Sequence, residues 1–342
     1  MAGNLSFVLR AVKDVAFEDR AKPKLRDHHD VIVHVSQTGI CGSDVHYWQR
    51  GRIGNYILTG PMVLGHESSG VVAEVGSLVK HLKVGDRVAM EPEMIFAATP
   101  PWDGTLAKYY VNASDFCYKV PDSMDMEESA MVEPVAVACA INKTADVRAH
   151  QTVIVMGCGP IGILSQAVAK QSGAKKVIGV DIVQSRLDLA AQYGADETFM
   201  PPRPEPGVEP IVHAERVAGL IREKFNLDDG ADVVLECSGA EACIQMGIFA
   251  TKPGGTFTQA GMGKENVLFP ITHVCTQALV IKGSIRYLNG CYPAAIDLIS
   301  TGKINVKRLI TNRYKFEQAE EAFELVRQAR QDVFKVMIEG VQ

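Results

Sequence analysis

Two short segments of this chain carry residue types that bind metals. Cys41 opens the segment Cys-Gly-Ser-Asp-Val-His, which ends at His46, and the pair His66-Glu67 follows further along. A thiolate, an imidazole and a carboxylate are all zinc ligands, and a catalytic zinc keeps three protein ligands and one open position. A mixed set fits such an ion better than the cysteine-rich sets of structural sites. A lone cysteine and a His-Glu pair also occur in proteins without metal, so the surrounding elements must support the interpretation.

A glycine-rich segment at 157–162 predicts a dinucleotide-binding site. It reads Gly-Cys-Gly-Pro-Ile-Gly, follows an apolar stretch directly and opens a helical one. The first glycine permits a tight turn, the second lets the backbone approach a pyrophosphate, and the third lets helix and strand pack closely. The phosphates would lie at the positive end of the helix. Cofactor contacts are therefore expected from Gly157, Gly159, Pro160, Ile161 and Gly162.

The acidic residue at the end of the next expected strand predicts which cofactor binds. Asp181 can accept hydrogen bonds from the adenine ribose hydroxyls, and its charge repels a 2′-phosphate. Neither Ile182 nor Val183 offers a compensating cation. Arg186 lies close enough to meet a phosphate, but it is equally suited to stack on adenine or to remain solvated. The pattern favours NAD over NADP, and the alternative for Asp181 is a purely structural helix cap.

The composition is that of an ordinary globular protein acting on small molecules. A chain of 342 residues predicts two domains, each with its own core. The net charge of -5 and the absence of a Lys/Arg cluster argue against nucleic-acid or acidic-membrane partners. No apolar run is long enough to span a membrane, and the N-terminus lacks the pattern of a signal peptide. The eight cysteines are scattered, which is typical of a reducing compartment, so we expect a cytoplasmic protein.

Periodicity divides the chain into a β-rich first part and an α/β part. Up to about residue 140, apolar and β-branched stretches alternate with Gly, Pro and Asp. Beyond that point short strands alternate with helices, which is typical of a parallel sheet with crossover helices. The expected strands are 152–156, 177–180, 233–235, 255–259, 279–283, 311–314 and 334–338. The expected helices are 161–172, 184–193, 293–300 and 316–328, and the proline-rich stretch 201–210 is expected to be a loop.

Together these features resemble the zinc-containing medium-chain dehydrogenase/reductase family, in its polyol dehydrogenase branch. The resemblance covers essentially the whole chain and is strongest to fungal xylitol dehydrogenases (D-xylulose reductases), with sorbitol and L-arabinitol dehydrogenases as near relatives. The segments that carry it are 38–47, 51–55, 63–67, 96–101, 103–110, 133–137 and 283–287. It implies an α/β fold in which a Rossmann doubly wound parallel sheet is inserted in a β-rich GroES-like catalytic domain. The implied domains are 1–140 with 288–342 for catalytic zinc, and 141–287 for NAD.

The same resemblance implies roles for individual residues. Cys41, His66 and Glu67 match zinc ligands of the polyol branch. Glu133 matches a position next to the metal, and which glutamate binds directly stays open. Ser43 and His46 match a proton relay, a role that suits a histidine because its pKa lies near neutrality. Substrate contacts are expected from Tyr47, Phe96, Thr99, Glu133, Arg286 and Tyr287, and further cofactor contacts from Ala260, Gly261, Met262, Ser284, Ile285 and Arg286.

One departure from the family concerns a second metal. Relatives commonly carry a lobe with four closely spaced cysteines and a structural zinc, but here Glu91-Pro92-Glu93-Met94 continues directly into Ile95-Phe96. Either the lobe was lost or the sequence omits a stretch. We therefore expect one catalytic zinc per chain and no structural zinc. Relatives usually form dimers or tetramers through the Rossmann edge strand, here about 279–285, so a homodimer or homotetramer is expected.

The expected activity is oxidation of a polyol at C2 to a ketose with NAD, most simply xylitol to D-xylulose. Sorbitol and L-arabinitol are the alternative substrates, because discrimination by one hydroxymethyl unit depends on pocket shape. A protein of another class, a non-catalytic dinucleotide-binding protein of the same fold, is a second alternative. The joint presence of six residues argues against it: Cys41, Ser43, His46, His66, Glu67 and Glu133.

Overall fold

The chain forms two compact units, each with its own sheet and core. The computed structural model describes residues 2–92 and 102–342. One unit comprises Met1–Glu133 and Tyr292–Gln342, and the other comprises Pro134–Cys291. The chain passes from one to the other within helix α3 (Val132–Ala145) and at the start of α9 (Cys291–Ser300). The first unit is therefore built from both ends of the sequence.

A six-stranded parallel sheet forms the centre of the unit Pro134–Cys291, with strand order β13-β12-β11-β14-β15-β16. Its central strands are short, rich in β-branched residues and almost fully buried, which is typical of parallel sheets covered on both faces. This order, with the chain starting in the middle and extending to both sides, is that of the Rossmann fold. The strands are β11 (Thr152–Met156), β12 (Lys176–Val180), β13 (Glu197–Phe199), β14 (Ala231–Glu236), β15 (Thr251–Gln259) and β16 (Val280–Gly283).

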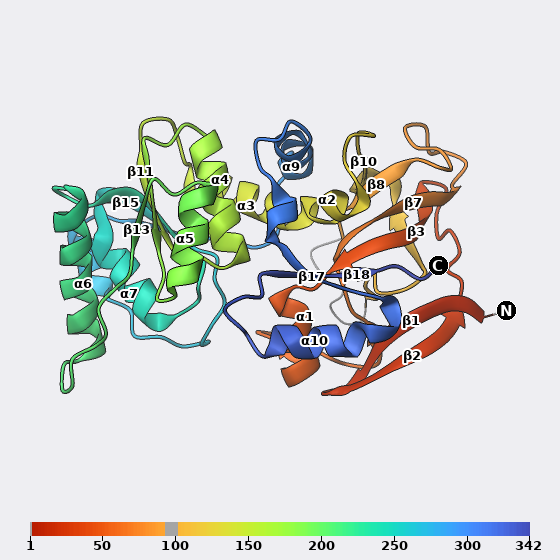
Figure 1. Cartoon of the computed structure of the whole chain (residues 1–342), viewed down its shortest axis with the longest axis horizontal. Helices are drawn as coiled ribbons and strands as arrows, with labels where there is room; N and C mark the ends of the chain where they lie inside the picture. The colour runs from red at the N-terminus through yellow and green to blue at the C-terminus, as the bar shows by residue number, and fades with distance from the viewer. Residues whose placement is uncertain (1, 93–101) are drawn as a thin grey trace. The chain divides into compact units, whose positions relative to one another are not determined.

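Helices cover both faces of this sheet (Figure 1). On one face α4 (Pro160–Gln171) and α5 (Gln184–Tyr193) pack together, and on the other α6 (Pro210–Phe225) packs on α7 (Glu241–Ala250). The sequence analysis predicted α4 and α5 but neither α6 nor α7. Pro210 was placed in a loop, whereas it begins α6, because proline fits the first turn of a helix where its missing N–H costs no bond. A shorter helix, α8 (Ile271–Thr276), precedes β16.

The other unit contains mostly antiparallel strands. Its main sheet has the order β10-β8-β7-β3-β18-β17, with β9 pairing on β3, and a second sheet has the order β2-β1-β6. C-terminal strands thus lie beside N-terminal ones in a single sheet. The strands are β1 (Ala2–Ala11), β2 (Asp14–Ala21), β3 (Asp30–Gly39), β4 (Arg52–Ile53), β5 (Tyr56–Ile57), β6 (Met62–Val63), β7 (Glu67–Val75), β8 (Arg87–Met90), β9 (Tyr109–Ala113), β10 (Cys117–Lys119), β17 (Ile310–Tyr314) and β18 (Lys335–Glu339).

Helix α10 closes the core of this unit. The helix expected at 316–328 is a short 3-10 turn, η3 (Phe316–Gln318), followed by α10 (Ala319–Arg327). Phe323 on α10 packs against Phe7 of β1 and edge-on against Trp48 of α1 (Gly42–Arg50). The last segment of the chain therefore stabilises the helix that carries the Cys41 motif. The remaining short elements of this unit are η1 (Ser114–Phe116), α2 (Met126–Ala130) and η2 (Val306–Leu309).

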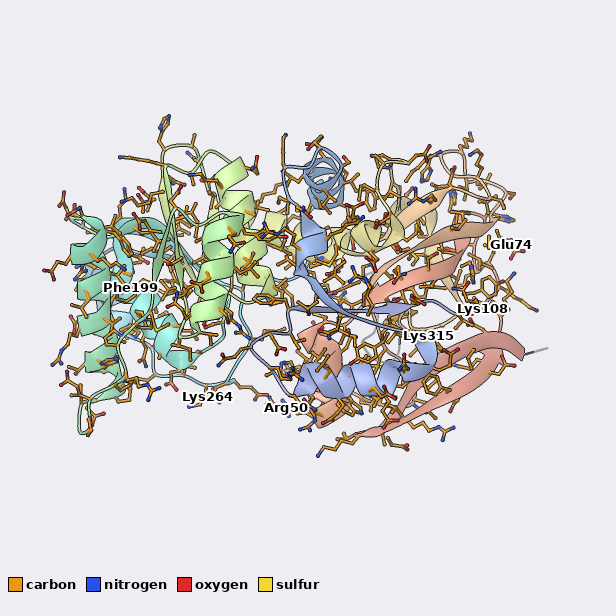
Figure 2. All side chains as sticks on the ribbon, viewed as in Figure 1. Arg50, Glu74, Lys108, Phe199, Lys264 and Lys315 are labelled. Atoms are coloured by element: carbon orange, nitrogen blue, oxygen red, sulfur yellow. The ribbon has the colours of Figure 1, made fainter. Side chains whose placement is uncertain are left out.

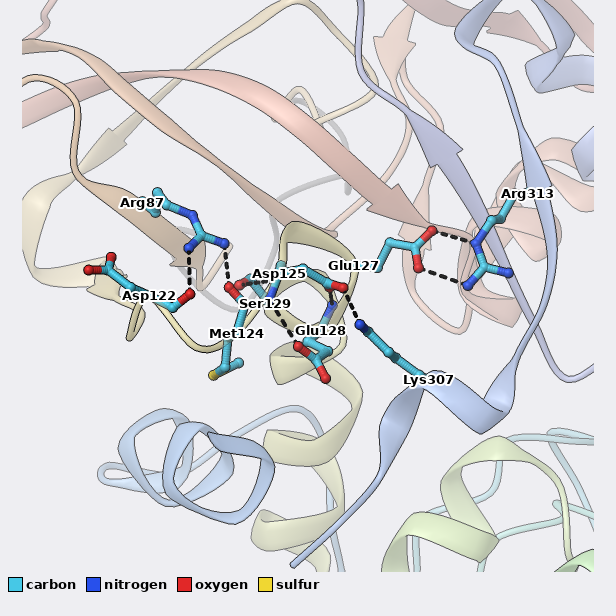
Figure 3. Close-up of polar contacts among 9 residues, drawn as sticks. All are labelled: Arg87, Asp122, Met124, Asp125, Glu127, Glu128, Ser129, Lys307 and Arg313. Atoms are coloured by element: carbon cyan, nitrogen blue, oxygen red, sulfur yellow. Dashed lines mark hydrogen bonds and ion pairs between the residues drawn. The ribbon is translucent and has the colours of Figure 1, made fainter. Parts of the chain in front are cut away.

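Ion pairs join the C-terminal part of the same unit to α2 (Figure 3). Asp125 caps α2 by accepting from the backbone N–H of Glu128, and its carboxylate also pairs with Lys307 at 2.5 Å. Glu127 accepts two bonds from the Arg313 guanidinium, at 2.5 and 2.8 Å. A bidentate pair of this kind fixes orientation as well as distance. The contacts hold α2 immediately before the helix that carries Glu133.

Charged side chains lie on the surface of both units. The labelled Arg50, Glu74, Lys264 and Lys315 point outward, whereas Phe199 is buried against Phe225 (Figure 2). In the described part of the chain, no helix has the length and apolar character needed to cross a membrane.

Candidate active site

The three expected zinc ligands come together in the unit built from both chain ends. Cys41 caps the start of α1, Glu67 is the first residue of β7, and His66 directly precedes that strand. Their ligand atoms all lie within 4.8 Å of one another. His66 and Glu67 are 6% and 1% exposed, so the group is buried apart from the cysteine. Among the described residues, this is the one group of His, Cys, Asp or Glu side chains arranged to hold a metal.

Asp44 ties the two ligand-bearing segments together. One of its oxygens accepts from the Cys41 backbone N–H at 3.1 Å and the other from the Gly65 N–H at 3.0 Å. The latter oxygen also lies 3.2 Å from Nδ1 of His66. This contact leaves Nε2 as the ring nitrogen available to a metal, with Asp44 as the carboxylate that orients the imidazole. The sequence analysis did not assign a role to Asp44, although its position within the Cys41 segment was the available signal.

The electrostatics of His66 agree with a cation site. Burial alone lowers the pKa of His66, but the carboxylate of Asp44 and the sulfur of Cys41 outweigh it and raise that pKa well above its ordinary value. Positive charge is therefore favoured at the imidazole. A metal ion bound there would take the place of that proton.

The proposed relay residues both lie on α1. Ser43 is in its first turn, with Oγ 3.3 Å from Nε2 of His66, so the hydroxyl lies beside the metal group. His46 is half-buried one turn further on. Burial, together with the nearby Arg50 cation, lowers the pKa of His46. A neutral imidazole able to accept a proton is therefore favoured near neutral pH.

Glu67 has a partner that the sequence motifs did not indicate. Lys335, the first residue of β18, places its Nζ 2.6 Å from both carboxylate oxygens of Glu67. Glu133 is also buried, at 5% exposed, in the first turn of α3. Its charge, together with that of Glu67, raises the pKa of Lys335. Glu133 does not belong to the group formed by Cys41, His66 and Glu67.

The donor set fits zinc. Sulfur, imidazole nitrogen and carboxylate oxygen are the ligand types zinc prefers, and bond lengths of about 2.0–2.3 Å place tetrahedral ligands about 3.5 Å apart. Separations of up to 4.8 Å in the chain admit the ion with small side-chain movements. Three protein ligands leave one position for a substrate oxygen or water.

The glycine-rich turn in the other unit has the form that a dinucleotide requires. Gly157 has a φ of 93°, and a side chain on Gly162 would come within 1.9 Å of the Gly157 carbonyl oxygen. Gly159 caps α4 and Pro160 is its first residue, so the helix begins where the motif predicts. A side chain at Gly159 would meet nothing within 4 Å, so its α-carbon is open to an approaching phosphate.

Asp181 follows β12 at the same edge of the sheet. It is 9% exposed and accepts from the backbone N–H groups of Cys158 and Val183, at 2.7 and 2.9 Å. The carboxylate thus supports the glycine turn as well as lying where a ribose is expected. Ile182, which follows it, is 75% exposed and carries no charge. Arg186 is half-buried on α5, and its Nε has no hydrogen-bond partner among the described residues.

Glu236, at the end of β14, is a buried residue that bonds several groups at this edge of the sheet. The sequence analysis missed it. Its carboxylate accepts from Ser238, from the Gly239 N–H and from Nε2 of Gln259, the last at 2.6 Å. Its backbone carbonyl accepts from Ala260 and Gly261. Glu236 therefore joins the ends of β14 and β15, where three expected cofactor residues lie, Ala260, Gly261 and Met262.

The remaining expected site residues are placed as follows. Tyr47 is 2% exposed and packs in the core with α10. Ser284, Ile285, Arg286 and Tyr287 follow β16, and Arg286 has a positive φ of 50°. Phe96 and Thr99 lie outside the described residues. The assignment of all of these to substrate or cofactor stays a prediction.

Comparison with known proteins places the chain in a family. Residues 27–122 match the alcohol dehydrogenase GroES-like domain, and residues 160–301 match the zinc-binding dehydrogenase domain. D-xylulose reductase A of Aspergillus niger is 50% identical over 359 residues, covering 99% of this chain and 98% of that protein. D-xylulose reductase A of Aspergillus oryzae is 48% identical over 359 residues, with the same coverage. Both matches are longer than this chain of 342 residues, so the relatives contain residues without a counterpart here.

A solved structure of another dehydrogenase superposes on this chain over nearly its whole length. The structure of L-idonate 5-dehydrogenase from Escherichia coli superposes with a TM-score of 0.86 at 26% identity, and the match covers 98% of each chain. The predicted fold class, a Rossmann sheet with a β-rich GroES-like domain, is confirmed. With near-complete coverage at about half identity to curated relatives, the chain belongs to the zinc-binding dehydrogenases of the medium-chain dehydrogenase/reductase family.

Proposed function

We propose that this protein oxidises xylitol at C2 to D-xylulose with NAD, and catalyses the reverse reduction, using one zinc ion per chain. The observation that carries the proposal is the identity of about half the residues with D-xylulose reductases over nearly the whole chain. The cluster of Cys41, His66 and Glu67 supports it. The unit containing this cluster would be the catalytic domain, and the unit with the parallel sheet would bind NAD.

The chain's own residues have separate tasks in this reaction. Zinc supplies a Lewis acid that lowers the pKa of the C2 hydroxyl, and NAD supplies the hydride acceptor. Cys41, His66 and Glu67 would hold the ion, with Glu133 nearby, and Asp44 orients His66. Ser43, beside Nε2 of His66, can pass the hydroxyl proton on, and His46 can accept it.

The cofactor preference follows from Asp181. Its buried carboxylate at the edge of the sheet can bind ribose hydroxyls, and the exposed Ile182 offers no positive charge to a 2′-phosphate. These features support NAD. All eight cysteines are free, which suits the reducing conditions of a cytoplasmic enzyme.

Steady-state kinetics of the purified full chain, with zinc content measured on the same sample, test this function. Xylitol, sorbitol, L-arabinitol and ribitol are compared with NAD and with NADP. We expect about one zinc per chain and the highest kcat/KM for xylitol with NAD. A higher kcat/KM for sorbitol or L-arabinitol would reassign the substrate. Stoichiometric zinc without turnover of any polyol would indicate a non-catalytic protein.

A further inference from the structure

A buried lysine shares the carboxylate of the candidate zinc ligand Glu67. Lys335 lies at the start of β18, and its Nζ is 2.6 Å from both oxygens of Glu67 and 3.3 Å from the Ile40 carbonyl oxygen. The side chains of Lys335 and Glu67 are 4% and 1% exposed. The ammonium group is therefore held within the protein, immediately beside the metal ligands.

The carboxylate of Glu67 packs closely against the backbone of β3. Gly39, at the end of β3, lies so close that a β-carbon there would be 2.4 Å from Oε2 of Glu67. β18 pairs directly with β3 through Met337 and Gly39. The lysine, the carboxylate and the Cys41 segment thus depend on the same strand pairing, so Glu67 must face Lys335 and the other ligands together.

When zinc is bound, this arrangement places two cations, the Lys335 ammonium and the metal ion, on one carboxylate. A buried carboxylate without a partner is costly, so Lys335 stabilises Glu67 in the metal-free chain. The same ammonium repels a nearby divalent cation and draws negative charge away from it. Its effects on the metal-free fold and on zinc affinity therefore have opposite signs.

We propose that Lys335 is a positioning residue that holds Glu67 in the metal-free protein and competes with zinc for its carboxylate. The proposal rests on the zinc site of the proposed function. This competition would weaken the bond between Glu67 and the metal.

The test is Lys335→Met in the full chain, with Lys315→Met as the matched control on the exposed surface of the same unit (Figure 2). Zinc affinity is measured by competition with a chromogenic chelator, and Tm is measured with and without zinc. We expect zinc affinity to rise on the order of tenfold while the Tm of the metal-free protein falls. In the cobalt-substituted protein the ligand-field absorption should also shift. Lys315→Met should change none of these quantities.

Two further variants keep the test decisive. Lys335→Gln retains a hydrogen-bond donor without charge, so it should also raise zinc affinity if Lys335→Met fails to fold. In a Glu67→Gln background, Lys335→Gln should raise zinc affinity by less than it does with Glu67 present, because the competition for the carboxylate is gone and only the direct repulsion between the ammonium and the ion remains. Unchanged or lower zinc affinity in both Lys335 variants would overturn the inference, leaving a lysine with a structural role only.

These outcomes are separate from failure of the proposed function, because affinity is measured without substrate. Higher zinc affinity in the Lys335 variants of a protein that oxidises no polyol would contradict the function alone. A wild-type chain that binds no zinc would overturn both.

Discussion

At the scale of single residues, the metal site depends on carboxylates that carry out different tasks. Asp44 bonds two backbone N–H groups and faces His66, whereas Glu67 faces Lys335. Asp181 combines backbone bonds with a position suited to ribose. The neighbours of each carboxylate, rather than its residue type, decide what it does.

We expect Asp44→Asn to weaken zinc binding by about 10–100-fold, because loss of an orienting carboxylate leaves the imidazole ligand poorly held. Zinc retained after chelator dialysis, measured by elemental analysis, checks this. Asp14→Asn, at an exposed position of the same unit, is the control and should retain wild-type zinc. Equal retention by both variants would contradict the role of Asp44.

The combination Asp181→Ser with Ile182→Arg should shift cofactor preference from NAD toward NADP. The first change removes the charge that repels a 2′-phosphate, and the second adds a cation at an exposed position. The ratio of kcat/KM for the two cofactors is the measurement. Asp181→Asn alone removes the charge and leaves one oxygen to accept from either the Cys158 or the Val183 N–H group, which Asp181 bonds through separate oxygens. An unchanged ratio in the double variant would refute the assignment.

At the scale of elements, carboxylates that are buried or lie at a helix end connect segments that are distant in sequence. Glu236 joins the ends of β14 and β15, and Asp86 joins the turn before β8 to β10. In α2, Asp125 and Glu127 connect to Lys307 and Arg313 near the C-terminus (Figure 3). Such contacts hold the segments from which the sites are built.

Glu236→Ala should destabilise the unit with the parallel sheet by about 2–4 kcal/mol, because several buried donors lose their acceptor. It should also raise KM for NAD by about tenfold, since Gly239 and the side chain of Gln259 lose the carboxylate that holds them beside the expected cofactor residues, while zinc content stays unchanged. Urea unfolding and NAD titrations measure the two effects. Glu215→Ala, exposed on α6, is the control. A stability loss with normal KM would limit Glu236 to a structural role.

Asp86 makes a stability contribution that depends on pH. Bonds from Lys119 and Lys83 hold the pKa of Asp86 well below its ordinary value. The folded state therefore binds this proton less readily than the unfolded chain, so the stabilisation is present at neutral pH. It is lost as pH falls below the ordinary aspartate range toward the lowered pKa.

Asp86→Asn should therefore lower the unfolding free energy by about 1–3 kcal/mol at pH 7 and by progressively less below about pH 4. Urea unfolding at several pH values provides the comparison. Asp122→Asn, at an exposed position, should follow the wild type throughout. A deficit that does not change with pH would show that the charge of Asp86 is not the cause.

At the scale of the whole molecule, the edge of the parallel sheet is the candidate assembly surface. β16 is the last strand of the sheet, and Val280, Ile281 and Ile285 are 43%, 40% and 63% exposed. An exposed apolar edge strand favours pairing with a second chain. The homodimer or homotetramer expected from the sequence, through β16, stays a prediction.

Val280→Asp with Ile281→Asp should convert this assembly to monomers, because two charges would be buried at the contact. Sedimentation velocity measures the change. Val212→Asp, at an exposed apolar position on α6, should leave the assembly intact. An oligomer that persists in the double variant would place the interface elsewhere.

The sequence by itself determined the family, the Rossmann sheet and the candidate ligands, because these depend on residue type and short spacing. Cys41, His66 and the glycines at 157–162 are recognisable wherever the chain folds around them. Helices 210–225 and 241–250 were missed. The first begins at a proline that was assigned to a loop, and the second is largely buried and lacks a clear polar face.

Only the tertiary structure decided which partners complete the site. Lys335 is distant from Glu67 in sequence and reaches it because β18 pairs with β3. The links from Asp44 to Gly65 and from Glu236 to Gln259 likewise exist only after the strands are placed. Short motifs encode the atoms that do the chemistry. The charges and hydrogen bonds that tune those atoms come from long-range strand pairing, which local patterns do not specify.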